Sequence, residues 1–385
     1  MKTVGVLGVG SIADVYVHNM RHMPNCRIVA VAARDTARTQ QRASDWNVSA
    51  ETPAGLIARN DIDVILNLTP PLAHFETTRA ALIAGKHVFS EKPLGITVAE
   101  AQALSALAAE AGLRLGVAPD TVFGAGLQKA REMIDAGMIG RPLMASASIL
   151  YHGADGWHPN PAFFYRAAGG GPIHDVGPYF IAALASLFGP IGRVTARAFR
   201  GFETRTITAE GPEKGMTVPV EVPTSVLSLL SFRSGLEATL SASWDVWKTG
   251  QPPIEVHGTL GSLQLPHPAW HGGPLKFARP NGDWEIIPVE QSILAQHNWP
   301  PDNPSSANYR GIGLAEMIDA LERGEPHRLS AEFATHVVEA ADAIIASADA
   351  DAAMSLALSP QRPAPIDAGD IARLIDAAPE PRDRR

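Results

Sequence analysis

The sequence predicts an α/β domain with a doubly wound parallel sheet, followed by an α+β domain with a large, mostly antiparallel open sheet. Over the first 120 residues, short apolar runs alternate with longer helical patterns, which is typical of βαβ units. From about residue 194 to 287, strand-like segments follow one another through turns without intervening helices. Because 385 residues exceed what one compact core usually holds, we expect two domains, 1–120 and 121–385.

The predicted strands of the first domain are continuous apolar runs, which indicates burial on both faces. They are Val4–Gly8, Ile28–Ala32, Val64–Leu68, His87–Phe89 and Leu113–Ala118. Apolar residues at helical spacing predict helices over Ile12–Met20, Thr36–Asp45, Ala73–Ala84 and Val98–Ala111. Strands joined through helices pair in parallel, so helices are expected on both faces of this sheet.

The second domain is expected to start with a helix, a strand and a longer apolar helix. These are predicted near Leu127–Ala136, Leu143–Tyr151 and Asp175–Leu187. After the run of strands, two further helices are predicted over residues 311–323 and 331–348. We expect these late helices to pack back on the first domain or beneath the second sheet.

Composition and charge exclude several classes of protein. The chain has 40 acidic and 32 basic residues and a formal charge of −8, so nothing in this balance favours a nucleic acid or an anionic membrane as partner. The longest apolar stretch, around residues 180–188, is too short to cross a bilayer. Cys26 is the only cysteine, and no Cys/His cluster indicates a metal site. Met1 and Lys2 lead into a predicted strand rather than a secretory signal, so a cytoplasmic protein is expected.

The first strand is followed by the residues GVGSIA, a G-x-G-x-x-A pattern that opens a predicted helix within a βαβ unit. Gly8 permits the tight turn, Gly10 lets the backbone approach a pyrophosphate, and Ala13 allows close packing of helix on strand. The helix start at Ser11 and Ile12 offers N–H groups and a positive dipole end to phosphates. Alone the pattern is weak, because glycines often only make turns. In this context it predicts a dinucleotide-binding Rossmann domain.

The end of the second predicted strand normally distinguishes NAD from NADP. An Asp or Glu there hydrogen-bonds the ribose 2′-hydroxyl and repels a 2′-phosphate. This chain has Arg34 at that point and Arg38 one helical turn later, and a guanidinium suits a phosphate. Asp35 stands next to Arg34 and could equally cap the following helix. The pattern therefore favours NADP over NAD.

Two segments of the first domain, Asn67–His74 (NLTPPLAH) and Ala84–Pro93 (AGKHVFSEKP), closely resemble the Gfo/Idh/MocA family of glucose–fructose oxidoreductase, inositol 2-dehydrogenase and their relatives. The resemblance implies that the Glu-Lys-Pro motif, which begins at Glu91, lies beside the nicotinamide, commonly with a cis Lys–Pro peptide. It also implies that Lys92 touches both cofactor and substrate hydroxyl. Further implied cofactor contacts are Thr69, Pro70 and His74. A histidine at a helix start is as often structural, and without the motif Lys92 would be a solvated lysine after a strand.

The resemblance continues through Gly169–Ala182, where the family usually reads G-G-G-x-x-x-D-x-G-x-H-x-x-D. Asp175 is retained, but Tyr179 stands at the position of the catalytic histidine and Ala182 at that of the last acidic residue. These positions therefore lack the His–Asp dyad of the inositol dehydrogenase type. Tyrosine at this point resembles glucose–fructose oxidoreductase and dimeric dihydrodiol dehydrogenase, which are NADP-using branches.

Hydride transfer at a carbinol carbon requires a proton carrier for the oxygen. An unperturbed phenol titrates at about 10, too high for a good base at neutral pH, and a nearby ammonium such as that of Lys92 stabilises a phenolate. Asp175 and Tyr179 are spaced i, i+4 and are expected on one helix face. Our hypothesis is that Tyr179 donates or accepts the proton, Lys92 tunes it and Asp175 orients the substrate. The alternative is a structural Tyr179 with its hydroxyl at the surface.

Further candidates for substrate contacts are His174, next to Asp175, and the loop that contains Trp157 and His158. The predicted function is reversible oxidation of a secondary alcohol, or reduction of a carbonyl, on a sugar or related polyhydroxy compound. The resemblance supplies the sugar preference. Two alternatives stay open: a glycosidase that retains its nicotinamide, and a non-enzymatic sensor of nicotinamide or sugar. Relatives frequently associate through the open face of the second sheet, so a homodimer or homotetramer is expected.

Overall fold

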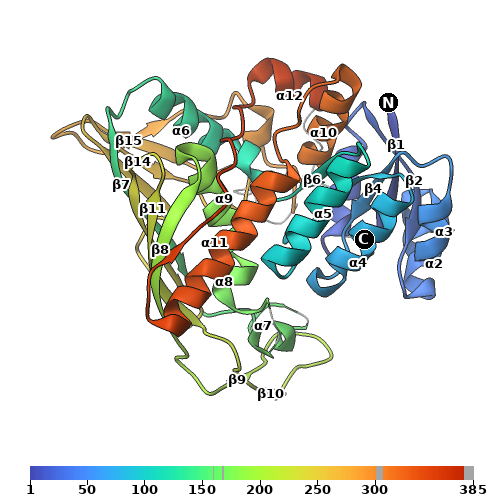
Figure 1. The fold of residues 1–385 in the computed structure, drawn as a ribbon, viewed down its shortest axis with the longest axis horizontal. Helices are drawn as coiled ribbons and strands as arrows, with labels where there is room; N and C mark the ends of the chain where they lie inside the picture. Colours follow the sequence, from blue (N-terminus) through green and yellow to red (C-terminus); the bar gives the residue numbers. More distant parts are fainter. Residues whose placement is uncertain (159, 167–168, 301–306, 377–385) are drawn as a thin grey trace.

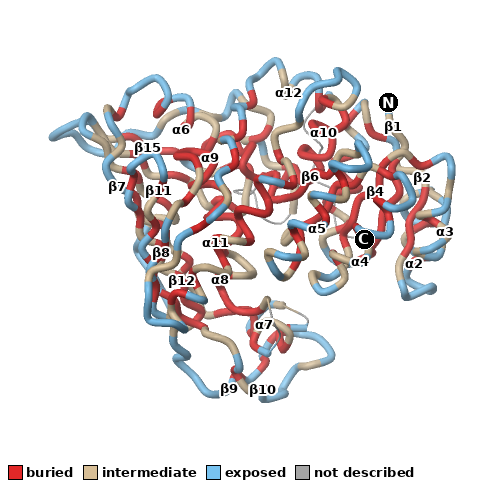
Figure 2. The backbone as a smooth tube through the Cα atoms, viewed as in Figure 1, coloured by how far each residue is buried: buried red, intermediate tan, exposed pale blue. Residues whose placement is uncertain are grey.

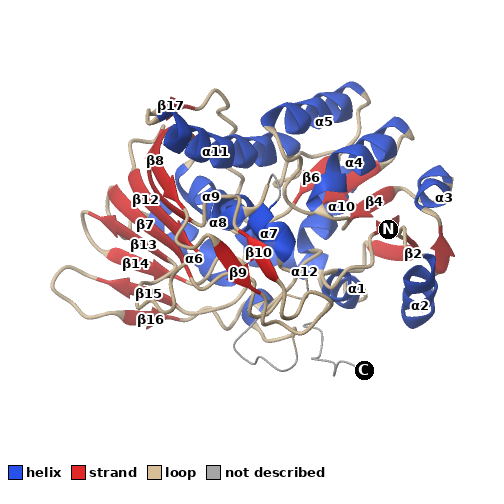
Figure 3. Ribbon diagram, turned by 90° about the horizontal axis from the view of Figure 1, so that it is seen from below, coloured by secondary structure: helices blue, strands red, loops and turns tan. Residues whose placement is uncertain are grey.

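The structure is a computed structural model that describes residues 1–158, 160–166, 169–300 and 307–376. Two sheets stand at opposite ends of the molecule, with helices between them and on the outside of the first sheet (Figures 1 and 3). The first sheet lies within residues 2–117, and the second within residues 142–355. In the described ranges, no helix is both long and apolar enough to span a membrane.

The first sheet has six parallel strands in the order β3-β2-β1-β4-β5-β6. They are β1 (Lys2–Leu7), β2 (Cys26–Ala32), β3 (Ser49–Glu51), β4 (Val64–Asn67), β5 (His87–Ser90) and β6 (Leu115–Val117). The helices of this domain are α1 (Ala13–Met20), α2 (Thr36–Trp46), α3 (Pro53–Ala58), the 3-10 helix η1 (Pro71–Ala73), α4 (His74–Ile83) and α5 (Val98–Glu110). The strand order reverses between β1 and β4, so the predicted doubly wound Rossmann sheet is confirmed.

The strand β3 and the helix α3 are not among the predicted elements. β3 has only three residues, Ser-Ala-Glu, and two of them are exposed, so it lacks an apolar run. It forms at the sheet edge by pairing with the apolar β2. The start of α3 did carry a signal, because Thr52 accepts a hydrogen bond from the N–H of Gly55 and Pro53 stands in the first turn.

The second sheet has nine strands in the order β16-β15-β14-β13-β7-β12-β11-β8-β17. Only β7 and β12 are parallel neighbours, so the predicted, mostly antiparallel sheet is confirmed. The strands are β7 (Pro142–Leu150), β8 (Ile191–Phe199), β11 (Ser225–Phe232), β12 (Glu237–Ser243), β13 (Ile254–Gly258), β14 (Ser262–Leu265), β15 (Leu275–Ala278), β16 (Glu285–Ile287) and β17 (Met354–Ser355). A separate ribbon pairs β9 (Thr204–Thr206) with β10 (Thr217–Pro219).

The helix α11 lies between the two sheets, where it contacts β8 of the second sheet and α5 and β6 of the first domain (Figure 1). α10 contacts α1, β5 and β6. The helices of the second part of the chain are α6 (Ala125–Asp135), α7 (Ala162–Arg166), α8 (Gly171–Asp175), α9 (Gly177–Phe188), α10 (Ile312–Arg323), α11 (Ala331–Ala350) and α12 (Ala368–Leu374), with the 3-10 helices η2 (Asp120–Phe123) and η3 (Ile293–Ala295). Both late helices thus pack on the first domain, and α11 also lies beneath the second sheet.

The hydrophobic core is shared by the two sheets. Every residue of α9 is buried, and buried residues occur along both sheets and the helices between them (Figure 2). One cluster of buried apolar side chains extends from Val4 of β1 through α9 to Phe277 of β15. Burial of this apolar surface is the dominant stabilising contribution to such a core. Because the core is continuous, the carboxyl ends of the parallel strands are held in a fixed relation to α8 and α11.

The prediction of one helix over Asp175–Leu187 is wrong at its start. The structure has two helices, α8 ending at Asp175 and α9 beginning at Gly177. Pro178 lies in the first turn of α9 and has no N–H to donate to the carbonyl of His174, which interrupts the helix. Asp175 and Tyr179 therefore do not share the face of one continuous helix, contrary to the prediction from their spacing.

Candidate active site

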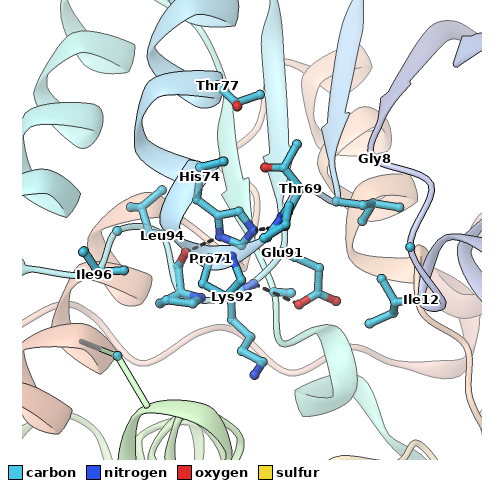
Figure 4. Close-up of a pocket in the computed structure, with 18 of the residues that line it drawn as sticks. Gly8, Ile12, Thr69, Pro71, His74, Thr77, Glu91, Lys92, Leu94 and Ile96 are labelled. Atoms are coloured by element: carbon cyan, nitrogen blue, oxygen red, sulfur yellow. Dashed lines mark hydrogen bonds between the residues drawn. The ribbon is translucent and has the colours of Figure 1, made fainter. Parts of the chain in front are cut away.

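A cavity of about 910 Å³ opens at the carboxyl ends of the parallel strands, and Figure 4 shows its wall on the first domain. One side consists of the glycine turn after β1, the ends of β2 and β4, and residues 91–96 after β5. The facing side comes from α7, α8 and α11. Open α/β sheets bind dinucleotides at this edge, where the strand order reverses, and ligand pockets commonly have volumes of roughly 300–1,000 Å³.

The glycine turn leaves room for a diphosphate. Gly8 has a φ angle of +108°, and a Cβ there would lie 2.4 Å from the carbonyl oxygen of Leu68. Gly10 lines the cavity, and a Cβ added to it would meet no atom within 4 Å. Ser11 and Ile12 line the same groove, while Ala13 is fully buried at the start of α1. The groove therefore fits a phosphate group close to the backbone N–H groups that begin α1.

Arg34, Asp35 and Arg38 line the cavity beside the glycine turn. Asp35 caps α2, since its Oδ1 accepts a hydrogen bond from the backbone N–H of Arg38 at 3.0 Å. The Arg38 side chain donates to the carbonyl of Val9 at 3.2 Å, which holds its guanidinium against the turn. Two guanidinium groups thus stand at the end of β2, where Rossmann domains bind the adenosine ribose. The carboxylate of Asp35, which stands between them in the sequence, is occupied by its hydrogen bond to the start of α2.

His74 joins two segments of the cavity wall. The side chain is 1% exposed, and its ring nitrogens lie 2.7 Å from the carbonyl oxygens of Thr69 and Pro93 (Figure 4). Burial lowers the pKa of His74. Thr69 and Pro70 line the same wall. His74 therefore lies at the cavity, where its contacts hold the loop after β4 against the Glu-Lys-Pro segment.

Lys92 reaches across the cavity from the first domain to α8. Its side chain points away from the parallel sheet (Figure 4), and its peptide bond to Pro93 is cis, as the family resemblance implies. Nζ donates to the backbone carbonyl of Asp175 at 2.6 Å and to its Oδ1 at 3.2 Å. Burial favours the neutral amine, but Asp175, Tyr179 and Glu91 outweigh it and raise the pKa of Lys92 above its ordinary value. The cavity therefore contains a fixed ammonium group.

Tyr179 lies behind Lys92. The centre of its ring is 5.1 Å from the Lys92 Nζ, and the residue is 9% exposed. The hydroxyl accepts a hydrogen bond from Nη2 of Arg310 at 3.1 Å, so it points into the protein and not to the surface. Within the described part of the chain, Asp175 and Pro178 belong to the cavity lining and Tyr179 does not. Lys92 thus stands between Asp175 and Tyr179.

Glu91 connects this region to the first domain. One carboxylate oxygen accepts a hydrogen bond from the Tyr16 hydroxyl at 2.8 Å, and the other accepts the backbone N–H of Lys92 at 2.9 Å. Arg310 lies on the same carboxylate, with Nε 3.9 Å from Oε1. Glu91 is thereby fixed in a buried position, from which it holds the Lys92 backbone.

The wall that faces the first domain contains a histidine–aspartate pair. His174 Nε2 lies 3.1 Å from Oδ1 of Asp342 in α11, and both residues line the cavity. His158 also lines it. Trp157 lies outside this lining: the residue is 62% exposed, and its indole N–H donates to the carbonyl of Gly153. Of the predicted substrate residues, the structure thus brings His174 and His158 to the cavity.

Several residues at the site were not predicted from the sequence. They include Phe163 and Phe164 of α7, Arg310 and Asp342. None of them stands in a recognisable motif, and Arg310 and Asp342 follow their partners by 131 and 168 residues. The aromatic run FFY at residues 163–165 is the only local signal that could have indicated one of them. In the described ranges, no group of three or more His, Cys, Asp or Glu side chains is arranged to hold a metal ion.

This fold and this cavity define an oxidoreductase with a dinucleotide-binding domain, and comparisons with known proteins identify its family. Residues 2–118 match the oxidoreductase family with an NAD-binding Rossmann fold, and residues 127–264 match the GFO/IDH/MocA C-terminal domain. The chain therefore belongs to the Gfo/Idh/MocA family of oxidoreductases. The resemblance inferred from its motifs is confirmed, and so is the prediction that it is an enzyme of the dehydrogenase and reductase class.

Several relatives are named for reactions on sugars or sugar derivatives. The dTDP-3,4-didehydro-2,6-dideoxy-alpha-D-glucose 3-reductase of Streptomyces violaceoruber is 32% identical over 75% of this chain and 82% of its own. The D-xylose 1-dehydrogenase (NADP(+)) 2 of Haloferax volcanii is 26% identical over 91% of this chain and 99% of its own. The solved structure of levoglucosan dehydrogenase without ligands has the same fold, with a TM-score of 0.79 at 22% identity, and the match covers 94% and 99% of the two chains.

Gly10→Leu is expected to weaken dinucleotide binding without unfolding the protein, because the new side chain enters the open groove and not a packed region. Calorimetry should show an affinity for NADPH and NADH that is lower by more than about tenfold, a change of roughly 1.4 kcal/mol. Gly8→Ala is the matched contrast, since its Cβ would overlap the Leu68 carbonyl and should lower both Tm and affinity. Unchanged affinity in Gly10→Leu would contradict this placement of the diphosphate.

Proposed function

We propose that the protein transfers a hydride between a nicotinamide and a secondary alcohol or carbonyl of a sugar or related polyhydroxy compound. The strongest support is the ammonium of Lys92, which extends from the dinucleotide side of the cavity to Asp175 on the facing wall. The nicotinamide, when bound, supplies or accepts the hydride. An oxygen that gains negative charge at the reacting carbon then meets a cation whose position is already fixed, which is the arrangement that stabilises developing charge.

Lys92 and Tyr179 form the proposed proton-transfer pair, and Asp175 orients the substrate. An ammonium has three N–H groups, and two of those on Lys92 are engaged by Asp175, so one is left for the substrate oxygen. The Tyr179 hydroxyl accepts from Arg310, which leaves its own hydrogen for donation. In the reducing direction the pair delivers a proton to the substrate oxygen, and in the oxidising direction it removes one.

The sugar class is supported by the names of the relatives and by the lining of the facing wall. His158, His174 and Asp342 offer donors and acceptors for hydroxyl groups. Phe163 and Phe164 add apolar ring surface next to them. A cavity with a few polar groups among aromatic side chains is typical of a site for a small polar ligand with apolar faces.

Tyr179→Phe is expected to lower kcat by about 10²- to 10⁴-fold, the usual contribution of a positioned acid or base. The measurement is absorbance of the reduced nicotinamide with D-xylose, levoglucosan and D-glucose as alcohols and 1,5-anhydro-D-fructose as carbonyl. Tyr309→Phe is the matched control, because the hydroxyl of this buried tyrosine donates to the carbonyl of Gln296, whereas that of Tyr179 accepts from Arg310. A wild-type rate in Tyr179→Phe would refute the role of Tyr179.

Consumption of one cofactor per product distinguishes a dehydrogenase from a glycosidase that retains its nicotinamide.

We also infer that NADP is preferred over NAD, since Arg34 and Arg38 stand at the end of β2 and Asp35 is engaged as a helix cap. Arg34→Ala should raise the Kd of NADPH roughly 10- to 100-fold, the effect of losing a hydrogen bond to a charged group. The Kd of NADH should stay nearly unchanged, because NADH lacks the 2′-phosphate. Parallel calorimetric titrations test this, and tighter binding of NADH by the wild-type protein would contradict the inference.

The open face of the second sheet supports a proposal of self-association. Met144, Leu227 and Leu229 are 49%, 54% and 57% exposed, and strand register places Leu227 and Leu229 on the face that the helices do not cover. We propose that copies of the chain pair through this face into a homodimer or homotetramer. Leu229→Asp should yield monomers in analytical ultracentrifugation, because an unpaired carboxylate is costly to bury. A monomeric wild-type protein would refute the proposal.

A further inference from the structure

A single buried arginine contacts several parts of the site at once. Arg310 precedes α10 and is 8% exposed. Its Nη2 donates to the hydroxyl of Tyr179 at 3.1 Å, its Nη1 donates to Oδ1 of Asn308 at 2.7 Å, and its Nε lies 3.9 Å from Glu91. No motif in the sequence indicates such a role, and nothing in the proposed hydride transfer itself requires an arginine here.

The backbone of Arg310 is anchored on both sides. The side-chain amide of Asn19 in α1 donates to the carbonyls of Asn308 and Arg310 at 2.8 and 2.9 Å. The N–H of Gly311 donates to the buried carboxylate of Asp120 at 2.8 Å. Because its main chain is tied to the helix that begins at the dinucleotide groove, Arg310 presents the same N–H group to Tyr179 at a fixed position.

The charges around Tyr179 are paired. The two cations that face its ring are Lys92, with Nζ 5.1 Å from the ring centre, and Arg310, with Cζ at 5.8 Å. Lys92 contacts the carboxylate of Asp175, and Arg310 contacts that of Glu91. Asp120 stands further back, bonded to the N–H groups of residues 311 and 313. Of the two cations, only Arg310 donates a hydrogen bond to the phenolic oxygen in the described contacts.

We propose that Arg310 is a positioning residue for proton transfer by Tyr179. By donating to one lone pair of the phenolic oxygen, it restricts the rotation of the hydroxyl, so that the hydroxyl hydrogen is directed away from Arg310. It also stabilises the negative charge that this oxygen carries after the proton has moved to the substrate oxygen. The proposal rests on the role of Tyr179 proposed above.

A guanidinium is suited to this task in a way that an ammonium is not. Its donors lie in one rigid plane, so that it can engage Asn308, Glu91 and Tyr179 together without rotating. The ammonium of a lysine, on its flexible stem, keeps the charge but loses the fixed direction of the donor. Arg310→Lys should therefore retain part of the effect, and Arg310→Met should lose it.

The test is a double-mutant cycle with Tyr179→Phe, assayed with the compound of the panel above that the wild-type protein turns over fastest. Arg310→Met is expected to lower kcat about 100-fold, with KM and the Kd of NADPH changed by less than about threefold, and Arg310→Lys should give an intermediate kcat. In the Tyr179→Phe background, Arg310→Met should cause no further loss, because residues that act through one group are not additive. Arg131→Met is the matched control: Arg131 is also 8% exposed but contacts Asp135 and the Ser186 carbonyl, so only its Tm should fall.

Several outcomes would overturn the inference. If Arg310→Met lowers kcat equally in both backgrounds, Arg310 acts on the structure and not through Tyr179, while the proposed function stands. A wild-type kcat in Arg310→Met also refutes the inference alone. If Arg310→Met does not fold, the same cycle with Arg310→Lys decides by the same criterion. A wild-type kcat in Tyr179→Phe, or no turnover of any compound of the panel, refutes instead the proposed function and with it this inference.

Discussion

The contact between Lys92 and Asp175 is the interaction on which the candidate site depends. It joins side chains 83 residues apart, one from the parallel-sheet domain and one from the end of α8 on the facing wall. Burial disfavours the charged form of an ammonium in this position and lowers its pKa when no carboxylate faces it. Asp175 instead keeps it protonated, and the two hydrogen bonds fix its direction. The same contact thus links the two walls of the cavity and places a cation where we propose that a substrate oxygen gains charge.

A second ion pair, between Arg310 and Glu91, lies next to the pair of Lys92 and Asp175 and supports it in the protein interior. Buried ions are tolerated when each has a partner and further hydrogen bonds, and removing one partner leaves a costly unpaired charge. Glu91 meets this condition through Tyr16, the backbone N–H of Lys92 and Arg310. Both cations are therefore connected to the Glu-Lys-Pro segment: Lys92 belongs to it, and Arg310 contacts its Glu91. This linkage explains why the polar groups of the site form one network from α1 to α9, and not separate contacts.

The sequence predicted the Rossmann sheet of the first domain well, because its strands and helices follow from local patterns, and the candidate cofactor residues there lie within short segments. Gly8–Ala13 and Glu91–Pro93 are local patterns whose spacing alone determines their geometry. The helix break between Asp175 and Gly177 could have been inferred from Pro178, since proline cannot donate to the carbonyl four residues earlier. The positions of Arg310 and Asp342 could not be inferred from the sequence. They depend on how the segment before α10 and the helix α11 pack against the shared core. Edge strand β3 was missed because pairing, not hydrophobicity, makes it a strand.

The two halves of the cavity differ in the same way: one is determined by local backbone geometry, and the other by side chains that distant segments bring together. The dinucleotide half follows from backbone geometry, such as the left-handed φ of Gly8 and the open space at Gly10, which any relative with this turn would share. The facing half consists of side chains from α7, α8 and α11, which carry no fixed backbone requirement at the cavity surface. Asp175 holds Lys92, but in the described contacts side chains such as those of Phe163, Phe164 and Asp342 do not touch it. Because the cofactor half is set by the backbone, differences in substrate between members of such a family are expected to arise in the facing half. In this chain we propose that His174 and Asp342, together with Phe163 and Phe164, contact the substrate.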